Sequence, residues 1–170
     1  MIWRQSVIIG TLLLLAVIIQ VTLLSRLGLP GATPDLVVVT VVAIAFAMGP
    51  LQGAAAGFAG GFFIGIAPPA DSLIGVNAAV YVTIGVITGL VVHPRDRTVA
   101  VMVGIVGLSA AGAVIATAAL DASLGSPRVV WEYIPGLALT SALYAVILAP
   151  LVILGVGWLT KQFAPEIAPP

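Results

Sequence analysis

The sequence predicts an all-α integral membrane protein with a single domain. Of its 170 residues, 61% are hydrophobic and 7% are charged, and the mean hydropathy of +1.27 lies far outside the range of soluble globular proteins. The apolar residues form long runs separated by short segments rich in glycine, proline and charge, as in a chain that crosses a membrane repeatedly. We expect one six-helix transmembrane domain over residues 1–170, with helices at about 5–25, 35–48, 51–67, 73–92, 98–120 and 133–160.

Charge and cysteine content narrow the possible partners. Six Lys and Arg residues balance six Asp and Glu residues, so the chain has no basic patch for nucleic acid or for anionic lipid headgroups. The absence of cysteine excludes disulfides, thiolate nucleophiles and cysteine-based metal sites. We therefore expect contact with membrane lipid and with other proteins, and none with nucleic acid.

The first apolar run, residues 6–25, is long enough to cross a membrane. It ends without the small-x-small pattern of a signal-peptide cleavage site, so we expect it to be retained as a helix. Gln20 is its one strongly polar residue. The amide either bonds to a neighbouring helix or is solvated at the membrane interface, and we favour the second interpretation.

Residues 26–35 are typical of a loop, and Pro34-Asp35 is typical of a helix start with a carboxylate at the positive end of the helix. Residues 36–67 carry no charge, but as one helix they would be about 48 Å long, which is too long for a single crossing. Gly49-Pro50 is the expected break between two shorter helices.

Glycines mark the helix after this break and the helix that follows it. In the first they recur at every fourth residue, which places them on one face where another backbone can approach closely. That helix is expected to stop near Ala67, because Pro68-Pro69 removes two backbone donors and Asp71 is costly to bury in hydrocarbon. The candidate helix-packing or partner-binding residues are Gly53, Gly57, Phe58, Gly61, Gly65, Gly85 and Gly89.

The basic residues predict the orientation. With both termini in the cytoplasm, Arg4, Arg95, Arg97 and Lys161 lie inside, whereas Arg26 and Arg128 lie outside, as the positive-inside rule requires. A five-span topology without the break at Gly49-Pro50, with its amino terminus outside, gives the same count. Helix length favours six spans.

No arrangement of residues in the sequence predicts catalysis. All six acids, Asp35, Asp71, Asp96, Asp121, Glu132 and Glu166, fall at expected helix ends, in loops or in the tail, so no carboxylate pair inside the membrane is expected for proton transfer. His93 lies in a charged loop, and no glycine-rich stretch is followed by Lys-Ser or Lys-Thr. We expect no enzyme activity, cofactor or metal.

An ordered series of motifs resembles MreD, a bacterial rod-shape-determining membrane protein family. The likeness covers roughly residues 12–90 and, more loosely, the last helix. It comprises Pro34-Asp35-Leu36, Gly57-Phe58-Ala59-Gly60-Gly61, Ala67-Pro68-Pro69-Ala70-Asp71, Gly75, the Gly85 and Gly89 pair, Pro135-Gly136, and Leu143-Tyr144 to Pro150-Leu151. Two positions depart from the family pattern, because Gly65 stands where an acid is usual and Ala145 stands where an asparagine is common.

The resemblance implies a non-enzymatic scaffold in the bacterial inner membrane. Such a protein binds MreC and acts with MreB, RodA and a penicillin-binding transpeptidase in cell-shape determination and lateral peptidoglycan synthesis. It also implies a six-helix fold similar to the substrate-binding component of energy-coupling-factor vitamin transporters. The loop candidates for partner contact are Arg26, Pro34, Asp35, Pro68, Pro69 and Asp71.

That fold similarity supplies the main alternative, a vitamin-binding transport component, which needs polar groups converging on one pocket. The residues available for such a pocket are Gln20, Arg26, Asp71, Asn77 and Tyr81. A third alternative, a small membrane enzyme, has only scattered Ser and Thr residues to support it.

Overall fold

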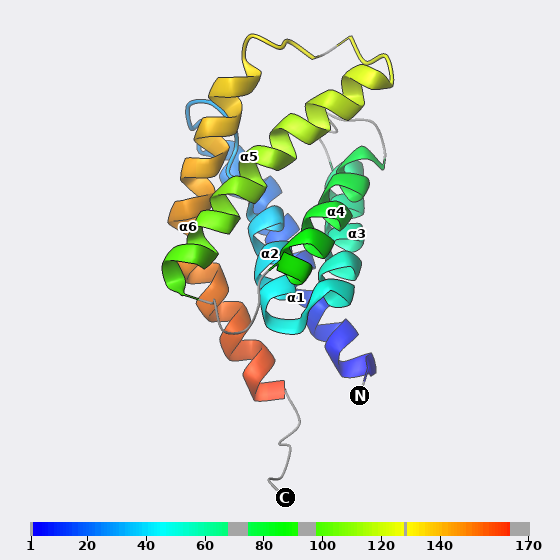
Figure 1. Cartoon of the computed structure of the whole chain (residues 1–170), viewed down its shortest axis with the longest axis vertical. Helices are drawn as coiled ribbons and strands as arrows, with labels where there is room; N and C mark the ends of the chain where they lie inside the picture. The colour runs from blue at the N-terminus through cyan, green and yellow to red at the C-terminus, as the bar shows by residue number, and fades with distance from the viewer. Residues whose placement is uncertain (1, 68–74, 92–97, 128, 164–170) are drawn as a thin grey trace, which may run out of the picture.

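A computed structural model describes residues 2–67, 75–91, 98–127 and 129–163 (Figure 1). Helices are the only regular secondary structure among these residues, and loops connect them. The α-helices are α1 (Ile2–Thr22), α2 (Leu36–Met48), α3 (Pro50–Ile66), α4 (Val76–Val91), α5 (Val99–Ser123) and α6 (Ile134–Phe163), with a short 3₁₀ helix, η1 (Leu24–Arg26), after α1. Pro68, Pro69 and Asp71 lie outside the described residues, as do the charged residues of segment 92–97.

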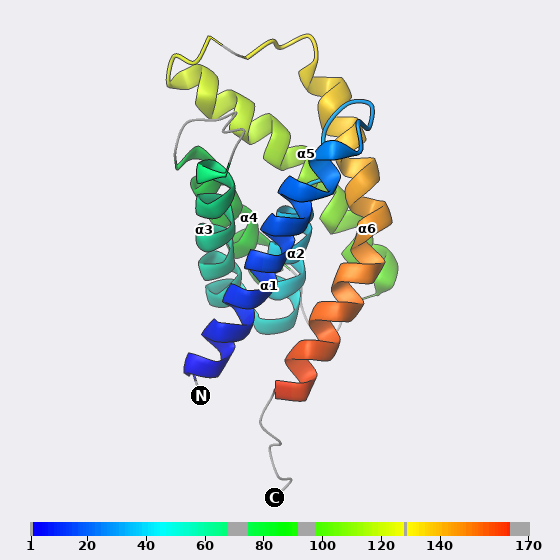
Figure 2. The ribbon, with the colours of Figure 1, turned by 180° about the vertical axis from the view of Figure 1, so that it is seen from behind.

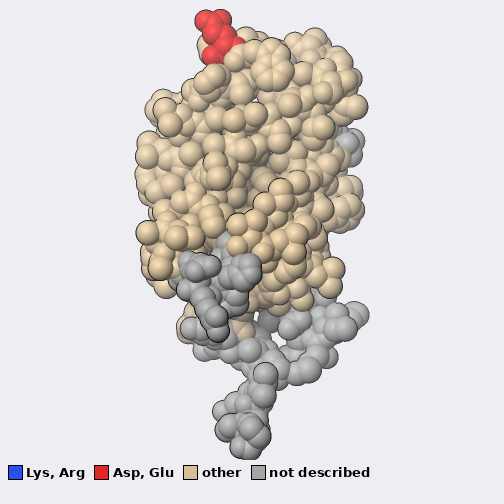
Figure 3. Space-filling model, in the orientation of Figure 1, with Lys and Arg blue, Asp and Glu red and all other residues tan. Residues whose placement is uncertain are grey.

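The long helices support the assignment as a membrane protein. Three segments, Ile9–Arg26, Val99–Ser123 and Ile134–Thr160, are long and apolar enough to cross a membrane. In the space-filling view of one face, the described surface carries charge only at one end (Figure 3). An apolar flank of this kind suits lipid contact.

Helix α2 lies at the centre of the bundle. It has only 13 residues, about 20 Å of helix, and every residue from Leu36 to Phe46 is buried. It contacts each of the other five α-helices, which surround it in Figures 1 and 2. A helix that is apolar on all sides is stable only inside a protein or in lipid, and here its neighbours shield α2 from the membrane.

Gly49 and Pro50 separate α2 from α3, at the break expected from the length of the uncharged run. The φ angle of Gly49 is 95°, a conformation that residues with a side chain rarely adopt. Pro50 follows as the first residue of α3, where its missing N–H has no helical partner to lose.

The glycines of α3 face the backbone of α4. A Cβ on Gly53 would lie 2.6 Å from the carbonyl oxygen of Gly85, and a Cβ on Gly61 would lie 2.5 Å from Cα of Ala78. Both distances are shorter than real Cβ contacts, so the two helices approach closely only because the side chains are absent. Gly65 is also buried, but a Cβ there would have nothing closer than the Gly75 nitrogen at 4.0 Å.

The loop between η1 and α2 is attached to α6, far away in the sequence. The Ala32 N–H donates a hydrogen bond to Thr140 Oγ1 at 3.0 Å, and the Tyr144 hydroxyl donates one to the Pro30 carbonyl oxygen at 3.0 Å. Gly31 has a φ angle of 86° and lies directly against Thr140. These contacts fix the chain that leads into Asp35.

Candidate functional site

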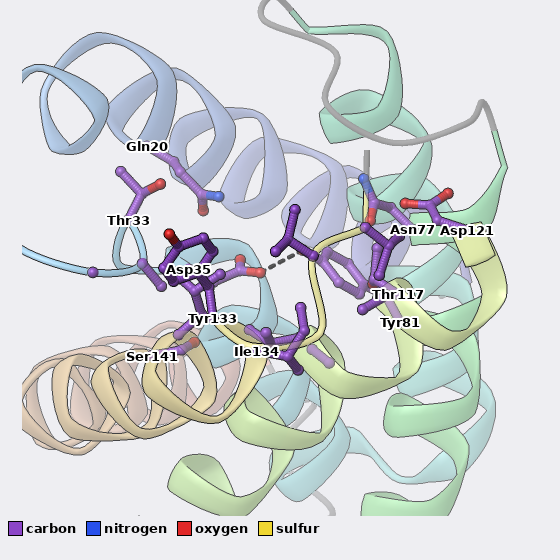
Figure 4. A pocket seen from close by; sticks show the side chains of 18 residues that line it. Gln20, Thr33, Asp35, Asn77, Tyr81, Thr117, Asp121, Tyr133, Ile134 and Ser141 are labelled. Atoms are coloured by element: carbon purple, nitrogen blue, oxygen red, sulfur yellow. Dashed lines mark hydrogen bonds between the residues drawn. The ribbon is translucent and has the colours of Figure 1, made fainter. Parts of the chain in front are cut away.

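A polar cavity of about 540 Å³ lies at one end of the bundle. This end is opposite to the one at which α1 begins and α6 ends (Figures 1 and 2). Its walls come from α1, α4, α5, α6 and adjoining loop residues, including Asp35 just before α2, and Figure 4 shows the lining side chains. The polar side chains on these walls are Gln20, Thr33, Asp35, Asn77, Tyr81, Thr117, Asp121, Tyr133 and Ser141.

Asp35 connects the start of α2 to the cavity. One of its carboxylate oxygens, Oδ1, accepts a hydrogen bond from the Val38 N–H at 3.0 Å, which caps α2. Oδ2 accepts a hydrogen bond from the Tyr81 hydroxyl of α4. Asp35 lies just before the first residue of α2. Burial raises the pKa of its carboxyl group above the ordinary value, while hydrogen bonds from Tyr81 and Val38 oppose that rise. Neutral donors from α1, α2 and α4 therefore hold this carboxyl group in place.

Gln20 of α1 makes a second side-chain hydrogen bond to the first turn of α2. Its Oε1 accepts a hydrogen bond from the Val37 N–H at 3.0 Å. The first turn of a helix has amide groups without helical partners, and the side chains of Gln20 and Asp35 satisfy two of them. The interpretation of Gln20 as a residue solvated at the interface was therefore wrong, and the hydrogen bond to a neighbouring helix is the one present.

Asp121 lies on the α5 side of the cavity. The sequence placed it in a loop after residue 120, but α5 continues to Ser123 and Asp121 is only 7% exposed. Asn77 and Asp121 both take part in polar or charged interactions. The cavity thus brings two carboxyl side chains, Asp35 and Asp121, to its walls, although no sequence pattern pairs these two acids.

The cavity has a distinct electrostatic character. The described residues that line it include two acids and no Lys, Arg or His. Its remaining polar groups are hydroxyls and amides, such as Ser141, whose Oγ donates to the Ala110 carbonyl oxygen at 3.5 Å. Walls of this composition favour a positively charged or hydrogen-bonding ligand over an anion.

A second concave surface runs between α4 and α5 and is mainly apolar. We call it the α4/α5 groove, and its volume is about 760 Å³. Helix α4 packs closely on α3 and α5 on α6, whereas α4 and α5 have few contacts with each other. Larger residues such as Ile87 and Leu108 adjoin small ones on its walls. The small residues are Ala79, Thr83, Thr88, Ser109, Gly112, Ala116 and Ala119.

The glycines proposed from the sequence line neither of these surfaces. Gly53, Gly57, Gly61, Gly85 and Gly89 pack inside the α3–α4 pair, so their faces are already occupied by the chain itself.

Phe58 is 60% exposed and stacks on Phe62, with a distance of 6.3 Å between the ring centroids. Among the loop candidates, Arg26 is exposed, Pro34 is buried and Asp35 lines the cavity.

Three of the residues considered for a transport pocket, Gln20, Asn77 and Tyr81, do line the cavity together. Arg26 is not among the lining residues. Sequence reasoning missed Thr117, Asp121 and Ser141. One signal was present, because Thr117 and Asp121 are four residues apart and so share a face of a helix.

These observations define the protein as a helical membrane protein with a polar cavity at one end and an apolar groove on its side. Comparison with protein families, with curated proteins and with solved structures gave no match.

Proposed function

We propose that the protein is a non-enzymatic scaffold of the MreD kind, which binds MreC in the bacterial inner membrane. Through MreC it would join MreB, RodA and a penicillin-binding transpeptidase in lateral wall synthesis. The ordered resemblance from Pro34-Asp35-Leu36 to the last helix motivates the proposal. The observation that carries it is the α4/α5 groove.

The lining of the groove suits a transmembrane helix. An α-helix with its side chains is about 10 Å wide, and close helix packing in lipid depends on small residues because lipid offers no hydrophobic driving force. Small side chains line both walls of the groove, and a Cβ on Gly112 would have no atom within 4 Å. The single membrane helix expected of MreC is the partner that we propose for it.

Filling the groove is expected to weaken MreC binding without unfolding the protein. Gly112→Leu and Ala116→Leu each place a large side chain where the partner helix would lie, and we expect co-purification with MreC to fall at least about tenfold, or roughly 1.4 kcal/mol of binding free energy. The matched control is Gly155→Leu on α6, which is outside the groove and has open space for a Cβ. Equal recovery of MreC with all three folded variants would contradict the proposal.

We further propose that all six helices belong to the membrane domain and that both termini are cytoplasmic. The start of α1 and the end of α6 lie at the same end of the bundle (Figure 1), which supports an even number of crossings. A reporter that is active only in the cytoplasm, fused to the carboxyl terminus, is expected to be active. Activity of a periplasm-specific reporter at that position would favour five spans instead.

The polar cavity favours a second candidate function, a substrate-binding component of a vitamin transporter. Its volume of about 540 Å³ lies in the range of small-molecule sites. Tight retention of a vitamin by the purified protein, together with normal cell shape after deletion of the gene and no recovery of MreC, would favour the transporter over the scaffold.

A further inference from the structure

We propose that the polar cavity binds a small organic cation, with the Asp35 carboxylate as the partner of its positive charge. This inference concerns a different surface from the α4/α5 groove. It holds whether or not the protein binds MreC.

Among the described residues, the surroundings of Asp35 supply hydrogen bonds but no full positive charge. Its described partners include the Val38 N–H and the Tyr81 hydroxyl, with further hydrogen bonds from the Gln20 side chain and the Val37 N–H. All of them are neutral, and the described lining residues include no Lys, Arg or His. The helix dipole of α2 places a partial positive charge at its amino-terminal end, which offsets roughly half of the negative charge of the Asp35 carboxylate. A cation in the cavity would compensate the remainder in a region where charges are poorly screened by water.

The size and lining of the cavity favour an organic cation over a bare metal ion. A space of about 540 Å³ is far larger than a metal site, and no group of three or more metal-ligating acidic, histidine or cysteine side chains occurs in the described part of the chain. Tyr81 and Tyr133 contribute aromatic side chains to the wall, and aromatic faces attract ammonium groups. Hydroxyl and amide groups from Thr117, Ser141 and Asn77 suit a ligand that also carries hydroxyl or amine groups.

The same lining argues against a lipid headgroup as the occupant. A zwitterionic headgroup would bring a phosphate, and the described walls offer that phosphate no cationic side chain. The walls therefore favour a free cation over the ammonium group of a phospholipid.

The test measures thermal stability of the purified full-length protein in detergent with choline, ethanolamine, putrescine and thiamine, each added as the chloride salt. Sodium chloride at equal ionic strength and 3,3-dimethyl-1-butanol, the uncharged analogue of choline, are the controls. We expect at least one of the organic cations to raise the midpoint of unfolding in a saturable manner, with no such shift from either control.

The variant Asp35→Asn removes the charge but keeps a residue that caps helices well. We expect it to fold and to bind the stabilising cation at least tenfold more weakly. Glu132→Gln is the matched control, because it removes one carboxylate at an exposed position outside the cavity, and its binding should equal that of the parent.

Four results would overturn the proposal. They are no stabilisation by any of the four cations, equal stabilisation of Asp35→Asn, stabilisation by sodium chloride alone, and recovery of a bound phospholipid that blocks the cations. The last result would identify a lipid headgroup as the occupant. We expect groove variants that lose MreC binding to bind the cation as the parent does. Failure of one proposal is therefore distinguishable from failure of the other.

Discussion

Gly57→Ala is expected to destabilise the protein by about 3 kcal/mol or more, near the upper end of the usual cost of overpacking. A Cβ on Gly57 would lie 2.2 Å from the carbonyl oxygen of Tyr81 and 2.6 Å from the nitrogen of Val82. Both atoms belong to the backbone of α4, so no side-chain rotation relieves the clash. The helices α3 and α4 must move apart, which also disturbs the other close contacts along their interface.

The effect is measured as the midpoint temperature of unfolding in detergent. Unfolding is monitored through the loss of monodisperse protein. The matched control is Gly104→Ala on α5, where a Cβ would meet no atom within 4 Å. Alanine is the better helix former by up to about 1 kcal/mol, so the control should be neutral or slightly stabilised. If Gly57→Ala and Gly104→Ala unfold at the same temperature, the close approach of α3 and α4 does not contribute to the stability of the protein.

Asp35→Ala is expected to cost about 2–4 kcal/mol of stability. It removes the cap of α2, worth about 1 kcal/mol, and leaves the Tyr81 hydroxyl without its partner, which costs about 1–3 kcal/mol for a buried group. Tyr81 is only 4% exposed. The two terms act through different atoms of one carboxylate, because Oδ1 serves the cap and Oδ2 serves Tyr81.

A double-mutant cycle with Tyr81→Phe separates the two terms. Adding Tyr81→Phe to Asp35→Ala removes the unpaired hydroxyl, so the double variant should be no less stable than Asp35→Ala alone. Asp35→Asn should retain most of the cap and lose less stability than Asp35→Ala. Strict additivity of the two single changes would show that Asp35 and Tyr81 do not interact in the folded protein.

Local chemistry made much of the fold predictable. Gly49-Pro50 divides one uncharged run into α2 and α3, and Pro34-Asp35 precedes the first residue of α2. The spacing of the α3 glycines predicted a face for close packing, but not which helix would occupy it. Only the three-dimensional arrangement shows that α4 does.

The polar cavity was predictable only in fragments. Gln20, Asn77 and Tyr81 could be named as polar groups near helix ends, but their convergence with Asp35 depends on the register of several helices. Asp121 was misplaced because the sequence has no strong stop signal at residue 120, and three further residues remain in α5. Helix boundaries are the least certain part of such predictions, and here one turn of helix decided whether a carboxylate was assigned to a loop or to a cavity wall.

The attachment of the first loop to α6 affects the order in which the molecule can be completed during synthesis. Pro30 and Ala32 bond to residues that follow them by 114 and 108 positions. At typical translation rates of about 5–20 residues per second, roughly 5–20 s pass between the synthesis of the two partners. During that interval the segment leading to Asp35 lacks its anchor, so the wall of the cavity that contains this carboxylate takes its final form only after α6 has been made and inserted.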